Sequence, residues 1–203
     1  MRIAVKVLVA IAAIGVAGYM FVRSAYNARA EPFEMAAVHL DGWTLALDAP
    51  NDASGSAISL RPPAGLPPNL FQQLFRRQME SLSTPADPGI SLALRSEIGS
   101  GVTGATLMAL AKEARLAGAR PSPRCVGYRR VSGTGATRQL YFVWFDLPEH
   151  ARFRQLFAPR AATPYRAEAL SPVMLMAAEP GFFGWHPVVV DEESDCVAPV
   201  NVR

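Results

Sequence analysis

Cysteine, histidine and lysine are all scarce in this chain of 203 residues. Two cysteines are too few for a disulfide-rich scaffold or for a zinc site with four cysteine ligands. The three histidines, His39, His150 and His186, are not paired at the spacing that zinc hydrolases use. Neither a G-x-S-x-G segment nor an S-x-x-K segment in the body of the chain marks a nucleophile. We therefore expect no metal and no other cofactor.

Residues 1–30 contain no acidic side chain. Their four basic residues are Arg2, Lys6, Arg23 and Arg29. Subtracting these from the 20 basic residues of the chain leaves sixteen, against 17 acidic residues, in residues 31–203. The formal charge of +3 therefore belongs to the N-terminal segment. Because domains that bind nucleic acid carry an excess of basic residues, no nucleic-acid partner is expected.

The same N-terminal segment contains an apolar run. Residues 7–22 carry no charge, and counting from Ile3 extends the run to about the 20 residues of a membrane span, if Lys6 extends its amine back to the headgroups. Basic residues precede the run, as in a secretory signal. We predict that residues 3–22 form one transmembrane or signal-anchor helix in the inner membrane. A signal cleaved near Ala30 and a buried core helix are the alternatives.

The charges around this run indicate which side of the membrane holds the rest of the chain. Positive charges precede it, and Glu31 and Glu34 follow it. Under the positive-inside bias, the N-terminus stays inside and the body is exported. Lysine occurs only at Lys6 and Lys112, a bias typical of high-GC bacterial genomes. We expect a single-pass inner-membrane protein with a soluble domain in the periplasm, or a secreted or periplasmic protein after cleavage near Ala30.

Residues 31–203 are expected to form a single soluble α+β domain, with a mixed, largely antiparallel sheet and about three packed helices. Alternating apolar residues predict the strands, and apolar residues at helical spacing predict the helices. The strands are expected in a hairpin over residues 36–48 around Asp41-Gly42, and at residues 57–61, 90–98, 125–132, 138–146, 172–178 and 187–190. The helices are expected at residues 69–83, 103–117 and 149–157, with a proline-rich connector at residues 62–68. Residues 140–145 are apolar on both faces, which is typical of a central strand.

The helix predicted at residues 69–83 has an apolar face wide enough for a core. This face consists of Leu70, Phe71, Leu74, Phe75, Met79 and Leu82. We expect the helix to pack on the domain through this face. The alternative is a helix that binds a partner or lies on a membrane.

The two cysteines, Cys125 and Cys196, are far apart in the sequence. An exported chain meets an oxidising compartment, so we expect one structural disulfide between them. The flanking arginines are Arg124, Arg129 and Arg130, and the acids before the second cysteine are Asp191, Glu192, Glu193 and Asp195. A disulfide would bring the two groups together, so we predict ion pairs between them. A calcium loop is the alternative for the acids, although the spaced ligands and glycine of an EF-hand are missing.

Residues 99–104 read G-x-G-x-x-G between a predicted strand and a predicted helix. That pattern can present a helix N-terminus to a pyrophosphate. A dinucleotide site also needs an acid about 20 residues further on, but the next acid after Glu113 is Asp146. We interpret the segment as a helix-entry loop, with a cofactor site and another anion site as alternatives.

An aromatic cluster near the C-terminus supplies the candidate binding residues. Phe182, Phe183 and Trp185 lie beside a Pro/Gly turn and could line a groove; inert packing is the alternative. They are the candidates for an exposed binding patch.

The candidate catalytic residues are two histidines and one acid. In a hydrolase, His186 would be the base and Asp191 the residue that orients it, with His150 as the other histidine. No serine is identified to complete such a site. The favoured function is therefore non-catalytic: a membrane-anchored periplasmic protein for binding, assembly or protection in the envelope, with an envelope protein as its partner. An exported hydrolase with a histidine-containing site is the alternative.

Overall fold

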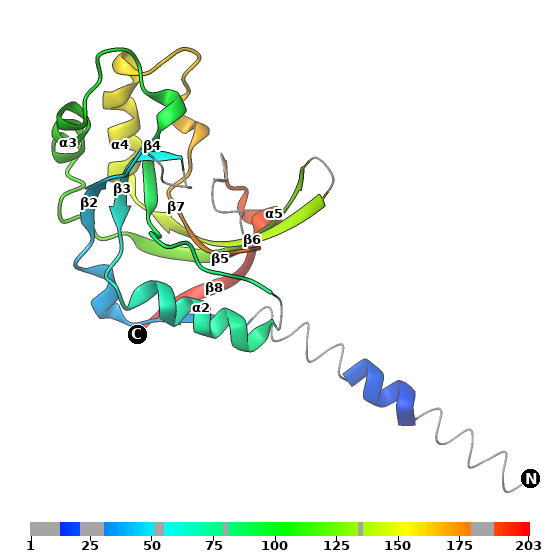
Figure 1. Cartoon of the computed structure of the whole chain (residues 1–203). Helices are drawn as coiled ribbons and strands as arrows, with labels where there is room; N and C mark the ends of the chain where they lie inside the picture. The colour runs from blue at the N-terminus through cyan, green and yellow to red at the C-terminus, as the bar shows by residue number, and fades with distance from the viewer. Residues whose placement is uncertain (1–12, 21–30, 51–54, 79–80, 134–135, 180–188) are drawn as a thin grey trace, which may run out of the picture.

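The computed structural model describes residues 13–20, 31–50, 55–78, 81–133, 136–179 and 189–203. Its centre is an eight-stranded sheet with the order β1-β8-β5-β6-β7-β4-β3-β2 (Figure 1). The strands are β1 (Phe33–Met35), β2 (Thr44–Leu47), β3 (Ser56–Arg61), β4 (Ile90–Leu94), β5 (Ser122–Gly133), β6 (Ala136–Asp146), β7 (Val173–Ala178) and β8 (Cys196–Val202). Among these described strands, only β1 and β8 pair in parallel. The predicted mixed, largely antiparallel sheet of an α+β domain is confirmed.

The helices cover this sheet in two places. The α-helices are α2 (Leu66–Arg77), α3 (Gly104–Glu113), α4 (Pro148–Phe157) and α5 (Glu192–Asp195), and the 3-10 helices are η1 (Ala37–Leu40), η2 (Arg95–Glu97), η3 (Ala158–Arg160) and η4 (Ala167–Ala169). α3 and α4 lie together beside β2, β3 and β4, whereas α2 lies against β1 and β7 (Figure 1). Residues 13–20 of the predicted anchor are also helical. Within the described ranges, no helix has the length and apolar content that a membrane crossing requires.

α2 begins earlier and ends earlier than the sequence pattern predicts. It starts at Leu66 instead of Asn69, because Pro67 and Pro68 occupy the first turn, where no intrahelical partner for their missing N–H groups is needed. It ends at Arg77, after which Gln78 adopts an extended backbone. Of the predicted core-facing residues, Leu70 and Leu74 are buried, and Leu66, which the prediction placed in the connector, is buried with them. Phe75 is 56% exposed, so the prediction is wrong at that position.

The predicted hairpin around Asp41-Gly42 is wrong. Gly42 has a positive φ of 80°, but Asp41 is extended, so only one of the two positions of a type I′ turn is left-handed. The residues before the turn form η1 instead of a strand, and the indole nitrogen of Trp43 donates to the carbonyl of His39 at 2.9 Å. β2 pairs with β3, from Thr44–Arg61 to Leu47–Ile58.

β6 is the central strand that its two apolar faces predict. Tyr141, Val143 and Phe145 join one buried cluster with α2, α3 and α4, and Leu140 and Phe142 join a second cluster on the other face. Phe142 packs against β5 where Gly127 leaves room, since a Cβ there would lie 2.2 Å from the ring. The long β5–β6 pair therefore connects both apolar clusters.

The sequence pattern does not predict two of the strands, β1 and β8. β1 has three residues, and β8 begins in the acidic run with Cys196 and contains Pro199, so neither shows clear alternation. Half of the strand predicted at residues 187–190 lies outside the described residues, and the other half, Val189 and Val190, belongs to no strand.

Candidate functional site

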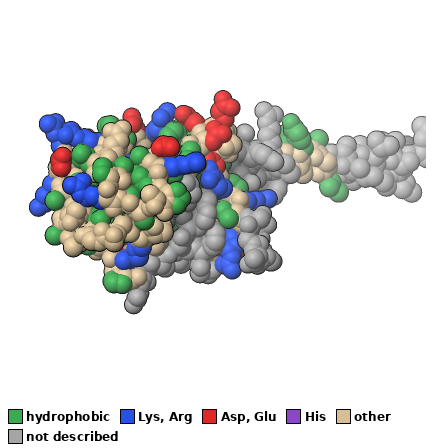
Figure 2. Space-filling view, turned by 90° about the horizontal axis from the view of Figure 1, so that it is seen from above, with side chains coloured by type: hydrophobic (Ala, Val, Ile, Leu, Met, Phe, Trp, Pro, Cys, Tyr) green, Lys and Arg blue, Asp and Glu red, His purple; other side chains and the backbone are tan. Residues whose placement is uncertain are grey.

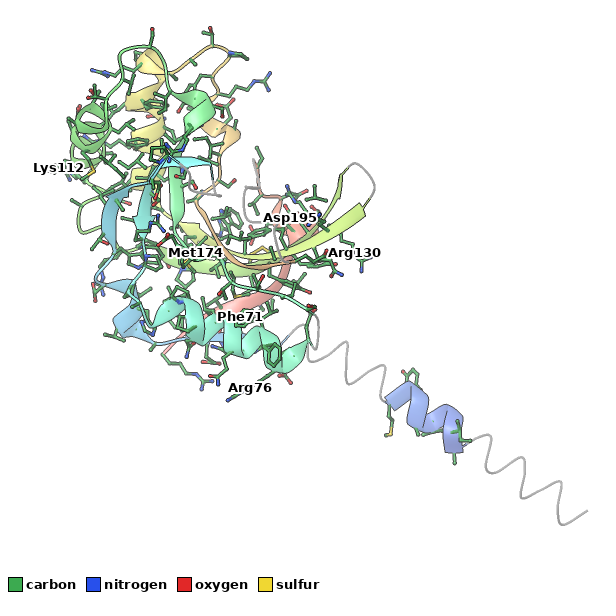
Figure 3. All side chains as sticks on the ribbon, in the orientation of Figure 1. Phe71, Arg76, Lys112, Arg130, Met174 and Asp195 are labelled. Carbon is green, nitrogen blue, oxygen red and sulfur yellow. A yellow bond between two sulfur atoms is a disulfide. The ribbon has the colours of Figure 1, made fainter. Side chains whose placement is uncertain are left out.

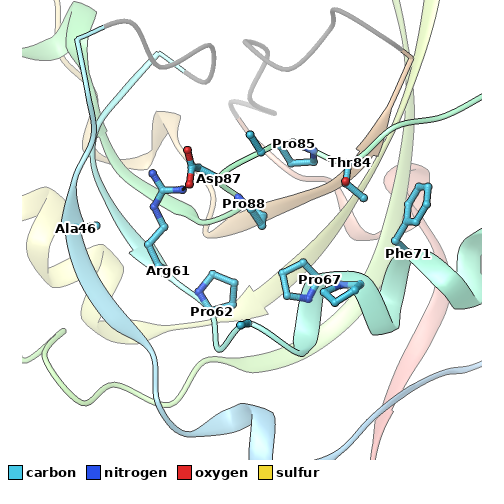
Figure 4. Close-up of a pocket in the computed structure, with 12 residues that line it drawn as sticks. Ala46, Arg61, Pro62, Pro67, Phe71, Thr84, Pro85, Asp87 and Pro88 are labelled. Carbon is cyan, nitrogen blue, oxygen red and sulfur yellow. Dashed lines mark ion pairs between the residues drawn. The ribbon is translucent and has the colours of Figure 1, made fainter.

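A groove of about 710 Å³ lies between the start of α2, the end of β3 and the loop at residues 84–88 (Figure 4). Its apolar lining consists of Ala46, Pro62, Ala64, Pro67, Pro68, Phe71, Pro85, Ala86 and Pro88. Its polar side chains are Arg61, Thr84 and Asp87. Apolar walls with a few convergent polar groups are the usual form of a ligand site, so this groove is the candidate functional site.

Proline gives the walls of the groove a fixed shape. Pro67 and Pro68 lie in the first turn of α2, and Pro85 and Pro88 restrict the opposite loop. The proline ring locks φ, so these segments have little backbone freedom to lose when a ligand binds. The backbone of the groove walls is therefore largely fixed.

A glycine brings the loop close enough to complete the groove. Leu60 of β3 pairs with Ile90 of β4, which places Gly89 against β3. A Cβ at Gly89 would lie 3.1 Å from the Arg61 side chain and 3.2 Å from the Leu60 carbonyl oxygen. With glycine there, the loop approaches closely and Asp87 faces Arg61 (Figure 4).

A buried carboxylate lies behind Arg61. The side chain of Asp48 is fully buried, and its Oδ1 accepts hydrogen bonds from the Ser59 hydroxyl at 2.9 Å and from the Arg61 guanidinium. Its Oδ2 is buried and has no hydrogen-bond partner. A narrow extension of about 20 Å³, lined by Asp48, Ser56, Ser59 and Ser91, reaches this carboxylate. That volume admits one water molecule or one small donor group.

The charges in the groove are unequal. Arg61 Nη1 lies 3.6 Å from Asp87 Oδ1, and the Asp87 side chain is 70% exposed. Among the described lining residues of the groove and its extension, two carboxylates, Asp48 and Asp87, face a single guanidinium. The excess of negative charge favours a ligand with a positive charge or hydrogen-bond donors.

A second polar cluster is buried between α4, η2 and η4. Arg154 is completely buried, and its two terminal nitrogens donate to the Glu97 carboxylate at 2.6 and 2.7 Å. The same guanidinium donates to the carbonyls of Arg166 at 3.0 Å and Ala167 at 3.1 Å. Its Cζ lies 4.6 Å from the centre of the Tyr165 ring, and burial raises the pKa of Tyr165 to about 12. These contacts hold α4 against β4 and the following loops.

His150 belongs to this buried region. Its Nε2 lies 3.2 Å from the carbonyl oxygen of Ser91, so Nε2 carries the proton and donates. Burial lowers the pKa of His150 to about 4, so the ring is neutral at pH 7. Within the described chain, no serine, threonine or cysteine side chain forms a hydrogen bond with His150. The observed contacts of His150 join α4 to β4.

The predicted disulfide joins Cys125 of β5 to Cys196 of β8, with their Cα atoms 5.7 Å apart. Two of the predicted ion pairs form beside it. Arg124 Nη2 lies 3.0 Å from Glu192 Oε2, and Arg129 donates through two nitrogens to the Asp195 carboxylate.

Arg130, the third of the flanking arginines, donates to the hydroxyl of Tyr128 at 2.6 Å. Burial by itself would raise the pKa of Asp195, but hydrogen bonds from Arg129 and the Asp191 backbone and the positive charge of Arg129 bring it below its usual value.

The remaining sequence candidates do not converge on one described site. Asp191 caps α5, since its Oδ1 accepts from the backbone N–H of Glu193 at 3.1 Å. The described contacts bring Asp191 to α5, whereas His150 contacts β4. The other candidates, Phe182, Phe183, Trp185 and His186, lie outside the described residues.

The glycine-rich segment is the helix-entry loop that we predicted. Thr103 caps α3 by accepting a hydrogen bond from the backbone N–H of Thr106 at 3.2 Å. Gly99 lies against η3, where a Cβ would be 2.3 Å from the carbonyl oxygen of Arg160, and Gly101 has a φ of 82°. Close approach and left-handed backbone therefore explain both glycines.

The sequence analysis missed the groove because it treated the proline-rich stretches as connectors. The available signal was two proline clusters, near Pro67 and Pro85, with Arg61 and Asp87 beside them.

Across the described ranges, no group of three or more His, Cys, Asp or Glu side chains can hold a metal ion. Comparisons of the chain with protein-family models, curated proteins and solved structures gave no match.

Proposed function

We propose that this protein is an envelope protein, held in the inner membrane by residues 3–22, with a periplasmic α+β domain that acts as a non-catalytic binding module. The observation that carries the proposal is the proline-walled groove beside Arg61 and Asp87. Its walls are rigid and mostly apolar, and its polar groups are few and held in place. Such a groove suits recognition of a ligand segment.

The chemistry of the groove supports binding more than catalysis. A hydrolase needs a nucleophile and a free general base within hydrogen-bond reach of each other. Oδ1 of the buried carboxylate, Asp48, already accepts hydrogen bonds from Arg61 and Ser59, so this atom is held by the protein's own groups. On the face in Figure 2, basic and acidic side chains are interspersed, with no single-sign patch of the kind that binds nucleic acid.

The ligand that fits these features is an apolar segment of an envelope protein with a basic side chain. Apolar side chains of that segment would contact Phe71 and the prolines, and the basic side chain would approach Asp87. The Asp87 carboxylate pairs with Arg61 at 3.6 Å, and because its side chain is 70% exposed a cation of the ligand can also reach it. The proposed role is assembly or protection of an envelope system.

The groove is tested by photo-crosslinking the full chain in bacterial cells. A photoreactive benzoyl-phenylalanine at Phe71, in the groove wall, should give a discrete adduct with one envelope protein. The same group at Lys112, exposed on α3, serves as the matched control and should give none. Asp87→Asn should weaken the adduct about fivefold, the effect of about 1 kcal/mol for one charge at contact distance. Equal labelling from both positions, or no adduct at Phe71, would refute the proposed binding role.

The anchor is tested separately. The described part of the apolar run, residues 13–20, has Ile14, Val16, Tyr19 and Met20 between 58% and 73% exposed, as an element that contacts lipid would. The intact chain should remain in the membrane fraction after alkaline carbonate extraction. A mature chain that starts at Glu31 by mass spectrometry would replace the anchor with a cleaved signal.

A further inference from the structure

The C-terminal end of α2 is fastened to the start of the domain. The Arg77 guanidinium donates to the carbonyls of Glu31 and Pro32, to the latter at 2.8 Å, and its Cζ lies 3.9 Å from the centre of the Phe33 ring. Gln73 exchanges two hydrogen bonds with the Glu34 backbone, at 2.7 and 2.8 Å. α2 therefore lies beside the point where the chain leaves the N-terminal segment.

This attachment limits how far α2 can lie from the anchor. If residues 3–22 cross the membrane, only residues 23–30 connect it to Glu31. A fully extended stretch of that length spans less than about 30 Å. The tether therefore keeps the side of the domain that carries α2 close to the bilayer. On that side, the effective concentration of lipid is high.

The exposed face of α2 has the composition of a surface that lies on lipid. The helix contains no acidic residue and ends in Arg76 and Arg77. Phe75 is 56% exposed and stacks on Phe71, with the ring centres 6.2 Å apart. Arg76 points away from the domain (Figure 3). Aromatic side chains favour the membrane–water interface, and arginines attract anionic headgroups.

The charges around α2 also suit an anionic surface. Arg203, at the C-terminus, is paired with Glu34 at 2.6 Å, and its backbone N–H donates to the Met35 carbonyl. This side of the molecule thus has three arginines, Arg76, Arg77 and Arg203. They face two carboxylates, Glu31 and Glu34. Arg203 is paired with Glu34 and Arg77 interacts with Glu31, so Arg76 is the cation that this side presents to an anionic surface.

We propose that the face of α2 around Phe75 and Arg76 docks on the anionic bilayer surface beside the N-terminal anchor. Phe75 enters the interface and Arg76 binds lipid headgroups, so the membrane fixes the orientation of the domain. The inference rests on the proposed anchoring and adds to it the surface that meets the lipid. The wall residue Phe71 connects this surface to the groove, so a ligand in the groove would be bound next to the membrane.

The test uses the full chain reconstituted in vesicles that contain about a third phosphatidylglycerol and a lipid with a nitroxide on its headgroup. A bimane fluorophore is attached at position 75 in F75C, or at position 112 in K112C as the control on α3. Quenching should be several-fold stronger at position 75 than at position 112. It should fall in vesicles of phosphatidylcholine alone, because the arginines then lose their anionic partners.

A second variant tests the arginine while the label stays at position 75. Arg76→Glu, in the F75C chain, should shift the docking equilibrium away from the membrane by roughly fivefold for each unit of charge changed. Arg152→Glu, at an exposed position of α4, should leave quenching unchanged. Equal quenching at positions 75 and 112 in a chain that resists carbonate extraction would overturn the docking surface and leave the anchor intact. Extraction of the chain by carbonate would overturn both proposals. A photo-crosslink from position 75 to a protein in cells would assign the face to a protein partner instead of lipid.

Discussion

Two clusters of ion pairs stabilise this domain, and they differ in burial and in origin. Arg154 and Glu97 meet in the interior, where Arg154 is completely buried. Arg124–Glu192 lies at the surface beside the disulfide, with side chains 44% and 60% exposed, whereas its neighbour Arg129–Asp195 is intermediate, with side chains 26% and 6% exposed. A buried pair fixes packing because neither partner has water as a substitute, whereas a surface pair loses little when it breaks. The two clusters should therefore respond very differently to the same kind of substitution.

The largest effect is expected from Arg154→Met. The substitution leaves Glu97 without its cation and removes the donors to the carbonyls of Arg166 and Ala167. Removing one partner of a buried ion pair costs about 3–5 kcal/mol. The free energy of unfolding, measured by denaturant titration of the full chain in mild detergent, should fall by that amount.

Arg152→Met is the matched control, because Arg152 lies two positions before Arg154 on the same helix and is exposed. It should change the free energy of unfolding by less than about 0.5 kcal/mol. If both variants lose the same small amount, the Arg154 cluster does not hold α4 in place.

Loss of the disulfide should have the second-largest effect on the free energy of unfolding. Replacing both cysteines, Cys125→Ala with Cys196→Ala, should lower the free energy of unfolding by about 2–4 kcal/mol, because the unfolded chain regains the freedom of a long loop. A reductant should lower the stability of the natural chain to the level of this variant and leave the variant unchanged. A natural chain that keeps its full stability with both thiols reduced would contradict this ranking.

Acid should weaken the buried cluster at His150. Its pKa is about 4 in the folded state, against 6.5 unfolded, so the unfolded chain binds more protons between these values. The contribution of His150 to stability is complete above pH 6.5 and is lost as the pH falls toward 4. Between pH 7 and pH 5 the loss from this group should be about 2 kcal/mol.

His150→Gln supplies the comparison, because a glutamine amide can donate to the Ser91 carbonyl but does not titrate. The difference in unfolding free energy between the natural chain and this variant should narrow or reverse from pH 7 to pH 5. A difference that stays constant over this range would show that the ring is not buried in its neutral form.

The two clusters also show what sequence can predict. The surface cluster follows from chain-local information: arginines flank one cysteine, acids precede the other, and one disulfide brings both runs together. The buried cluster does not, because Glu97 and Arg154 are far apart in the chain and meet only after β4 and α4 pack. A signal did exist: His150, Phe153, Arg154 and Phe157 occupy one helical stripe, so a charged residue stood at a core position.

The same distinction explains the rest of the fold. The apolar pattern of β6 and the stripe of α2 depend on neighbours in sequence; the prediction for β6 is confirmed, and that for α2 is confirmed at Leu70 and Leu74 but not at the exposed Phe75. The hairpin prediction failed because β2 pairs with β3 instead of with the residues before Asp41. Tertiary packing, and not the local sequence, determines this pairing. The groove depends on Gly89 letting a loop approach Arg61, which no local pattern records.

The smallest effect is expected at Arg124–Glu192. Both side chains are largely exposed, at 44% and 60%, so water replaces either partner when the other is removed. Arg124 also lies over the ring of Trp144, with its Cζ 4.4 Å from the ring centre, so Arg124→Ala removes more than the ion pair. A double-mutant cycle with Glu192→Ala isolates the pair and should give a coupling free energy below about 1 kcal/mol. The coupling should shrink further in 1 M salt, where the screening length is about 3 Å. A coupling above about 2 kcal/mol that survives salt would place this pair with the buried cluster, and burial would then not be what separates the two.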